Sequence, residues 1–256
     1  MTTSPWGPPI DVLPLLAREE QALVAVLSGL SRDDWATPAA GATVHELAAR
    51  ILGAKLIRLS RVRDDHPPGD GFAGHWLPAV SRLSPEVLFS MLVDSTAQLT
   101  DLWKHRDADE LVEDVPAWLV LARDYSWSWM RQQQIREAVD APLLDEPEFR
   151  TPVVDTLLRG LPSALREITA RPGRQVACRV TDAGQWTARA TSDGWTIAPG
   201  AATSRSPLAT LSTDADALWR HCTGTTVGDR IQTTGSPAAA AAVLALKGCE
   251  GSLHGL

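Results

Sequence analysis

The chain has 256 residues, and 44% of them are hydrophobic, which is enough for one large folded domain or two of ordinary size. The formal net charge of -7 and the lack of clustered lysine and arginine argue against a protein whose main task is to bind nucleic-acid phosphates. No basic, apolar leader opens the sequence and no apolar run reaches the ~18 residues of a membrane span, so we expect a cytoplasmic protein without membrane contact.

The three cysteines are far apart and form no CxxC pair, so the sequence predicts neither a disulfide framework nor a thiolate zinc site. We expect Cys222 to be a small buried residue and not a nucleophile. Only Lys55, Lys104 and Lys247 are lysines, while alanine, leucine and tryptophan are abundant. This bias accompanies GC-rich coding sequence and favours an actinobacterial source.

Helices are expected through the first 170 residues, where apolar side chains recur at helical spacing. Thr43 and Glu46 stand three residues apart, the capping-box arrangement that begins a helix. Proline and glycine predict a loop at 64–74 and a second break at 142–152. Short connections favour an antiparallel bundle over residues 1–170. The expected helices are 10–30, 43–62, 84–106, 119–139 and 153–169, with the last one interrupted at Gly160.

The pattern changes after residue 170, where short β-branched runs alternate with Asp-Ala-Gly and Ser-Asp-Gly turns. These turns are typical of hairpins, so residues 171–256 are predicted to form a small α+β domain. The expected strands are 175–180, 185–190, 194–197, 209–213 and 230–233, and the expected helices are 214–222 and 237–246.

The segments 35–53 and 125–138 and the order of the two domains resemble the mycothiol-dependent maleylpyruvate isomerase family. The resemblance implies a DinB-like four-helix bundle at 1–170. The motifs Ala217-Leu218-Trp219 and Gly235-Ser236-Pro237 are similar to the sterol-carrier-like α+β domain that often follows it. The fold class implied is α plus α+β.

The family holds a metal with residues that this chain lacks. Arg50 stands where the family has a histidine, and Trp127, Arg131 and Gln134 stand where it has a glutamate, a histidine and an aspartate. A guanidinium has no lone pair to donate and stays protonated, so it does not bind a divalent cation. We therefore expect no metal and no obligatory cofactor, with mycothiol as an alternative cofactor.

The replaced positions predict a different pocket. Trp127, Arg131 and Gln134 share one face of a helix, and Arg50 belongs to a facing helix. Two guanidiniums in one pocket require a counter-anion, either a substrate carboxylate or phosphate or the chain's own Glu46 and Asp124. We favour an anionic small-molecule substrate.

The leading hypothesis is a metal-independent enzyme of specialised metabolism that isomerises, cyclises or rearranges this anion. Arg50 and Arg131 would fix or polarise a carboxylate or carbonyl group. Tyr125 and Glu46 are candidates for proton transfer, as are Asp124 and His45. Apolar walls of the substrate site are expected from Trp127, Trp129, Trp118 and Trp76.

Other interpretations remain open. Arg50 can pair with Glu46, four residues earlier, as a surface ion pair without function. Trp127 and Trp129 are two residues apart and cannot share a helical face, so at least one is ordinary packing. The competing functions are a non-catalytic small-molecule binding or self-protection protein and a mycothiol-dependent transferase or isomerase. The substrate and the oligomeric state are left open by the sequence.

Overall fold

The computed structural model describes residues 4–64, 72–112 and 114–246. Its internal contacts divide the chain into two compact units. The described residues of 11–145 form the helical unit, and the described residues of 4–10 and 146–246 form the sheet unit.

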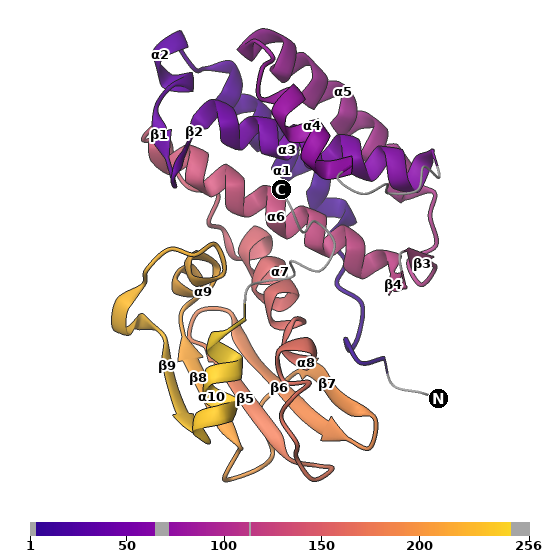
Figure 1. Cartoon of the computed structure of the whole chain (residues 1–256), viewed down its shortest axis with the longest axis vertical. Coiled ribbons are helices and arrows are strands. Elements are labelled where there is room, and N and C mark those ends of the chain that lie inside the picture. Colours follow the sequence, from indigo (N-terminus) through magenta and orange to yellow (C-terminus); the bar gives the residue numbers. More distant parts are fainter. Residues whose placement is uncertain (1–3, 65–71, 113, 247–256) are drawn as a thin grey trace. The chain divides into compact units, whose positions relative to one another are not determined.

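The helical unit is built on four long helices, α1 (Leu13–Ser28), α3 (Val44–Arg58), α5 (Pro85–Lys104) and α6 (Ala117–Ala138). Each of them packs against two of the others, in the cyclic order α1, α5, α3, α6 (Figure 1). The predicted helices are therefore confirmed within a few residues at their ends. The shorter elements are α2 (Arg32–Trp35), the π-helical turn η1 (Leu59–Arg63), α4 (Phe72–Val80) and the two-residue strands β1 (Pro38–Ala39), β2 (Ala42–Thr43), β3 (Leu111–Val112) and β4 (Val115–Pro116).

The capping signals explain where these helices begin. Thr43 and Glu46 form the predicted capping box, in which each side chain binds the backbone N–H of the other residue. Ser84 caps α5 by accepting a hydrogen bond from the N–H of Val87. The helix α4 was not predicted, because the loop expected at 64–74 overlaps its start; residues 65–71 lie outside the described part of the chain.

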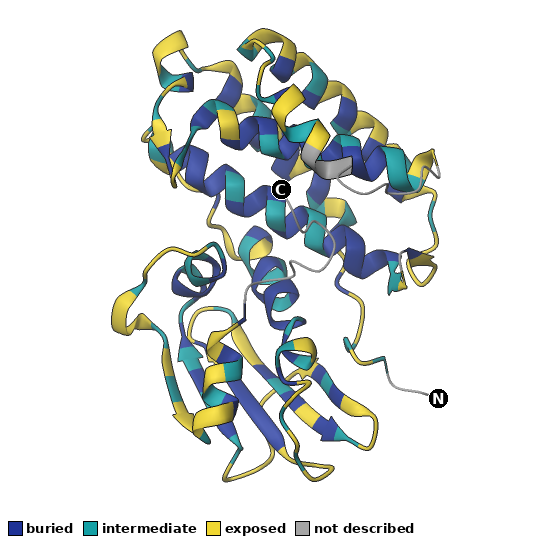
Figure 2. Ribbon diagram, in the orientation of Figure 1, coloured by how far each residue is buried: buried dark blue, intermediate teal, exposed yellow. Residues whose placement is uncertain are grey.

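The core of the helical unit lies between the long helices, and Figure 2 shows dark blue residues along α3 and α6. Leu47, Ile51 and Leu52 of α3 pack with Leu88 of α5 and Ile135 of α6. Full burial of each such side chain contributes about 1.5–3 kcal/mol to folding. Both α3 and α6 also bury polar side chains, which is unusual for a helix core and locates the candidate site.

The sheet unit contains one five-stranded sheet in the order β7-β6-β5-β8-β9. The parallel pair is β5 with β8, and the other neighbouring strands are antiparallel. The helix α10 packs on β8 and β9, and α8 packs on β7 (Figure 1). The elements are β5 (Gln175–Val180), β6 (Gly184–Thr191), β7 (Gly194–Pro199), β8 (Ala209–Thr213), β9 (Gln232–Gly235), α7 (Pro147–Leu158), α8 (Leu161–Ala164), α9 (Ala215–Cys222), η2 (Gly228–Arg230) and α10 (Pro237–Leu244).

The contacts divide the chain between Asp145 and Glu146, whereas the sequence predicted a boundary at residue 170. The helix α7 starts at Pro147, inside the predicted break, because proline suits the first helical position. It belongs to the sheet unit by contact with α9 and by a 2.6 Å hydrogen bond from Trp186 Nε1 to Asp155. The predicted helix 153–169 therefore starts earlier, and its second part ends at Ala164.

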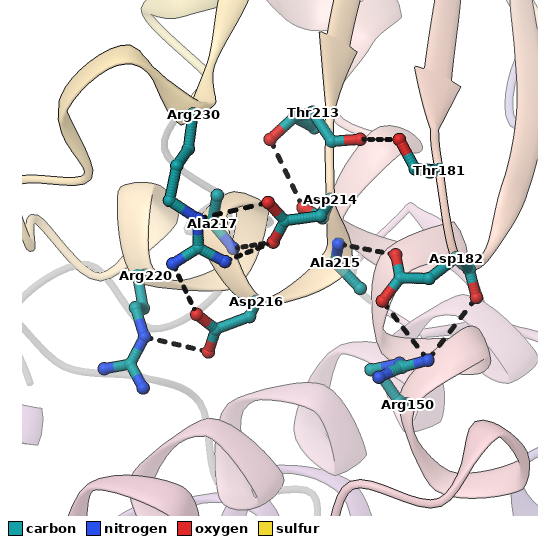
Figure 3. A network of polar contacts seen from close by, with 10 residues as sticks. All are labelled: Arg150, Thr181, Asp182, Thr213, Asp214, Ala215, Asp216, Ala217, Arg220 and Arg230. Atoms are coloured by element: carbon teal, nitrogen blue, oxygen red, sulfur yellow. Dashed lines mark hydrogen bonds and ion pairs between the residues drawn. The ribbon is translucent and has the colours of Figure 1, made fainter.

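Two polar networks hold parts of the sheet unit together. Arg159, which is buried, binds Asp155 and the backbone carbonyl of Trp6, and so fastens residues 4–10 to α7. The second network surrounds the start of α9 (Figure 3). There Asp214 caps the helix, and Arg230 pairs with both Asp214 and Asp216.

Within the described residues, no helix combines the length and hydropathy needed to cross a bilayer. Cys178 and Cys222 are both buried. Burial raises the pKa of Cys178 to about 12, so this thiol is not a nucleophile at neutral pH. The prediction that Cys222 is a small buried residue is confirmed.

Candidate functional site

The helical unit encloses a cavity that receives residues from all four long helices. The cavity and its mouth together contain about 490 Å³ of empty space, but only about 30 Å³ is available to the centres of water-sized molecules. As it stands the cavity therefore has room for very few waters, and a larger molecule enters only if side chains move. We call it the bundle cavity, and it is lined by Leu16, Glu20, Ile51, Ala54, Lys55, Arg58, Thr96, Leu99, Trp103, Leu121, Asp124, Trp127 and Ser128.

A buried ion pair between α3 and α1 lies at this cavity. The ammonium group of Lys55 contacts Oε1 of Glu20, and the two side chains are 9% and 4% exposed. The other oxygen of Glu20 accepts a hydrogen bond from Thr96 Oγ1 of α5 at 3.0 Å. Three helices therefore fix the position of one lysine amine.

A second carboxylate, that of Glu19, comes from the residue before Glu20 on α1 and is completely buried. Ser128 of α6 donates to its Oε1 at 3.2 Å, and Gln132 donates to its backbone carbonyl at 3.0 Å. Arg136 extends the network by donating to Gln132 Oε1 at 3.2 Å and to the carbonyl of Ala22 at 3.0 Å. These bonds satisfy polar groups that would otherwise be costly inside a bundle.

The second cation of the cavity is Arg58, one turn after Lys55 on α3 and on the same face. Its Nε and Nη2 donate to the two carboxylate oxygens of Asp124 at 2.7 and 2.9 Å, a bidentate arrangement. The guanidinium side chain is 2% exposed, whereas that of Asp124 is 22% exposed. Arg58 is therefore fixed, and its carboxylate partner is the group with access to water.

Burial shifts the protonation of two of these groups. Desolvation lowers the pKa of Lys55 from 10.5 to about 8, although the charges of Glu19 and Asp124 act in the opposite direction. Desolvation also raises the pKa of Glu19 from 4.5 to about 7, against the effects of Lys55, Ser128 and Arg136. Of these two groups Lys55 lines the cavity, so its amine is the one placed to exchange a proton with a bound molecule.

Three of the residues predicted for the pocket do contact one another. The guanidinium of Arg131 lies 5.2 Å from the ring centroid of Trp127, a cation–π contact. Arg131 Nη1 also donates to Gln134 Oε1 at 3.0 Å. Among the described residues that the sequence named as candidates for catalysis, proton transfer or substrate binding, Trp127 and Asp124 line the bundle cavity.

The predicted α3 residues lie on a neighbouring face. The cavity face of α3 runs through Ile51 and Lys55, and Arg50 is turned from it by roughly 100° because each helical residue rotates by that angle. Arg50 is half-buried, and Glu46 is exposed with its carboxylate used in the capping box. His45 has its Nε2 2.9 Å from the carbonyl oxygen of Leu83. These positions favour structural roles for Glu46 and His45.

The remaining aromatic candidates are largely packing residues. Tyr125 and Trp129 are buried, and Trp129 donates to the carbonyl of Leu144 at 2.9 Å. Trp118 is buried as well, and Trp76 is half-buried against the core of the helical unit. Of the predicted pair Trp127 and Trp129, the second is therefore the packing residue.

Sequence reasoning missed Lys55, Arg58, Glu19 and Glu20. A signal was present, because Lys55 is one of few lysines and stands between the apolar residues Ile51 and Ile57 on a predicted helix. Such a lysine must either reach water along its stem or find a buried partner. Asp124 was named as a candidate for proton transfer, and the structure places it at the cavity with Arg58 as its partner.

The residues do not fit a divalent metal. The carboxylates of Glu20 and Asp124 each face a cation, so a metal there would add positive charge beside Lys55 and Arg58. The described residues contain no group of three or more histidine, cysteine, aspartate or glutamate side chains able to hold a metal ion.

The helical bundle and the mixed sheet that follows it make up a two-unit fold that recurs in solved structures. The chain is similar to the crystal structure of the mycothiol-dependent maleylpyruvate isomerase, at 17% identity and a TM-score of 0.52, over 91% of this chain and 96% of that one. A histidine-to-alanine variant of the same enzyme matches at the same identity and coverage, with a TM-score of 0.53. No protein-family model and no curated protein sequence matches the chain. The similarity shows a shared fold.

Proposed function

We propose that the chain is a metal-independent enzyme that isomerises, cyclises or rearranges a small anionic organic molecule in the bundle cavity. The observation that carries the proposal is the pair Lys55 and Arg58, two buried cations on one face of α3 that both line the cavity. The fold shared with an isomerase agrees with this class of reaction. Lys55 and Arg58 take the roles that the sequence suggested for Arg50 and Arg131.

Arg58 is the proposed anchor for the substrate carboxylate. Its guanidinium is buried and oriented, and the carboxylate that it binds belongs to the more exposed Asp124. An incoming carboxylate can replace Asp124 in the same bidentate geometry, because Asp124 can turn toward water without leaving a buried charge unpaired. Trp127 and Trp103 would form the apolar wall beside the substrate.

Lys55 is the proposed acid and base. Desolvation brings the pKa of Lys55 to about 8, so the amine can donate a proton or accept one near neutral pH. Glu20 lies in contact with Lys55 and can hold the proton between steps. Movement of a proton at the carbon next to a carbonyl group is the common step of isomerisation and rearrangement in such anions.

The test is hydrogen–deuterium exchange catalysed by the full chain in D2O, followed by NMR. The substrates would be small 2-oxo acids and maleylpyruvate, with and without a metal chelator and with and without mycothiol. We expect exchange that survives the chelator, that falls at least about tenfold in Lys55→Arg, and that is unchanged in the exposed control Lys104→Arg. Absence of exchange and of conversion with every substrate would contradict the proposal.

The alternative is a mycothiol-dependent isomerase, which the fold similarity to such an enzyme favours. Conversion of maleylpyruvate only when mycothiol is present would support this alternative. Saturable binding of mycothiol by calorimetry would support it independently of the choice of substrate. Loss of activity with the chelator would instead contradict metal independence for either reaction.

A further inference from the structure

We propose that Lys55 is a covalent catalytic residue that forms an imine with the carbonyl carbon of an aldehyde or ketone in the bundle cavity. The inference rests on the proposed function and specifies its substrate class as small carbonyl compounds. Its basis is the position of Lys55, a cavity-lining amine whose side chain is 9% exposed and which shares the cavity with Trp103, Leu121 and Trp127. Because the cavity has room for very few waters, little water is present to hydrolyse an imine that forms there.

The contacts of Lys55 supply the proton acceptor that an amine nucleophile needs. Its Nζ contacts Oε1 of Glu20, and Thr96 holds the other oxygen of that carboxylate at 3.0 Å. The charged groups facing Lys55 are Glu19 and Glu20 from α1 and Asp124 from α6, with Arg58 following on α3 itself. Because Asp124 is engaged by Arg58, Glu20 is the base that directly contacts the amine.

The step balances with groups already present. Lys55 transfers one Nζ proton to Oε1 of Glu20, and the nitrogen lone pair then forms a bond to the carbonyl carbon while the C=O π electrons move to oxygen. Protons from nitrogen and from Glu20 are delivered to that oxygen, which leaves as water when the C=N bond forms. The net reaction is amine plus carbonyl compound to imine plus water.

The protonation state of Lys55 agrees with this role. With a pKa of about 8, lowered by desolvation, the amine is neutral in a substantial fraction of molecules at neutral pH. An ordinary lysine with a pKa near 10.4 is protonated almost completely under those conditions. The buried position therefore selects Lys55 over exposed amines as a nucleophile.

The chain is suited to a direct test because it has only three lysines, Lys55, Lys104 and Lys247. The full chain would be incubated with glyoxylate, pyruvate or acetaldehyde in the presence of sodium cyanoborohydride, whose hydride reduces an imine to a stable secondary amine. Peptide mass mapping then locates the adduct. We expect Lys55 to be labelled at least about tenfold more than Lys104 at neutral pH, and its labelling to rise through about pH 8.

The matched variants are Lys55→Arg, which keeps the positive charge opposite Glu20 but offers no amine, and Lys104→Arg. Labelling at position 55 should disappear in the first and persist in the second. Equal labelling of all three lysines in the wild-type chain, or labelling only of lysines other than Lys55, overturns the inference. This outcome is measured on the wild-type chain, so it does not depend on whether Lys55→Arg folds.

Deuterium exchange of the substrate without any adduct at Lys55 overturns the imine and leaves the proposed proton-transfer function standing. An adduct at Lys55 without exchange supports the imine and contradicts the proposed proton transfer.

Discussion

Arg58 and Asp124 are joined by two hydrogen bonds, from Nε at 2.7 Å and from Nη2 at 2.9 Å, although the guanidinium side chain is only 2% exposed. The pair links α3 to α6 at the bundle cavity. Burying both charges has a large desolvation cost, so the attraction between them mainly offsets that cost. Loss of one partner is therefore expected to be much more harmful than loss of both.

The change Asp124→Asn should reduce the free energy of unfolding by about 3 kcal/mol, because it removes the carboxylate charge that binds the buried guanidinium of Arg58. The measurement is urea unfolding followed by circular dichroism. The double variant Arg58→Leu, Asp124→Leu should recover much of the loss. As a control, Asp101→Asn removes an exposed carboxylate near His105 and should change stability by less than about 1 kcal/mol. If the double variant lost as much unfolding free energy as the sum of the losses caused by changing Arg58 and Asp124 singly, this account would be contradicted.

The buried carboxyl of Glu19 should make stability depend on pH. Its pKa is raised from 4.5 to about 7 by desolvation, so the folded chain holds a proton that the unfolded chain has already released between these values. The free energy of unfolding should therefore fall as pH rises from 4.5 to 7, by as much as about 3 kcal/mol from this group. Lys55, with a pKa lowered from 10.5 to about 8, should add stability as pH rises between those two values.

The variant Glu19→Gln should remove the fall between pH 4.5 and 7 and leave the rise above about pH 8. The exposed control Glu110→Gln should keep both slopes. Urea unfolding at a series of pH values measures them. Identical slopes in the wild type and in Glu19→Gln would show that another group is responsible.

The elements that the sequence predicted correctly are those fixed by local signals. Thr43 and Glu46 begin α3 as expected, because the capping box depends only on residues three apart. The strands on both sides of the Ser-Asp-Gly turn were also predicted, because the turn itself restricts the hairpin. By contrast, the membership of α7 in the sheet unit depends on its contacts with α9, which is distant in sequence.

The candidate site was harder to predict, because it depends on the rotation of each helix about its axis. On α6 the spacing of four residues, about one helical turn, predicted that Trp127 and Arg131 are neighbours, and their side chains are in contact. On α3 the same reasoning selected Arg50, whereas Lys55 and Arg58 face the cavity. Sequence periodicity identifies a polar stripe, but it does not show which carboxylates of other helices meet that stripe.

At the start of α9, the contribution of a helix cap to stability can be measured separately from that of an ion pair. Asp214 accepts a 2.8 Å hydrogen bond from the N–H of Ala217 and also pairs with Arg230, whose side chain is 46% exposed (Figure 3). The change Asp214→Ala removes both interactions and should cost about 1–2 kcal/mol. Arg230→Gln removes only the exposed pairing and should cost less than about 1 kcal/mol. Urea unfolding of the two variants compares these values, and equal losses would assign the stabilisation to Arg230 instead of the cap.

Residues 4–10 should be held on the sheet unit through Gly7, which has a φ of +74°. A Cβ at this position would collide with the carbonyl oxygen of Ile197 and with Nη1 of Arg159. The change Gly7→Ala should therefore lower the free energy of unfolding by more than about 2 kcal/mol, since strain in the left-handed region adds to the collision. Gly173→Ala is the matched control, because Gly173 has a φ of +90° with no atom within 4 Å of the new Cβ. This variant should lose only about 1–2 kcal/mol of unfolding free energy.

The measurements are urea unfolding and limited proteolysis. Cleavage before residue 10 should become faster in Gly7→Ala and stay unchanged in Gly173→Ala. Equal losses and unchanged proteolysis would mean that this segment contributes little to the stability of the sheet unit.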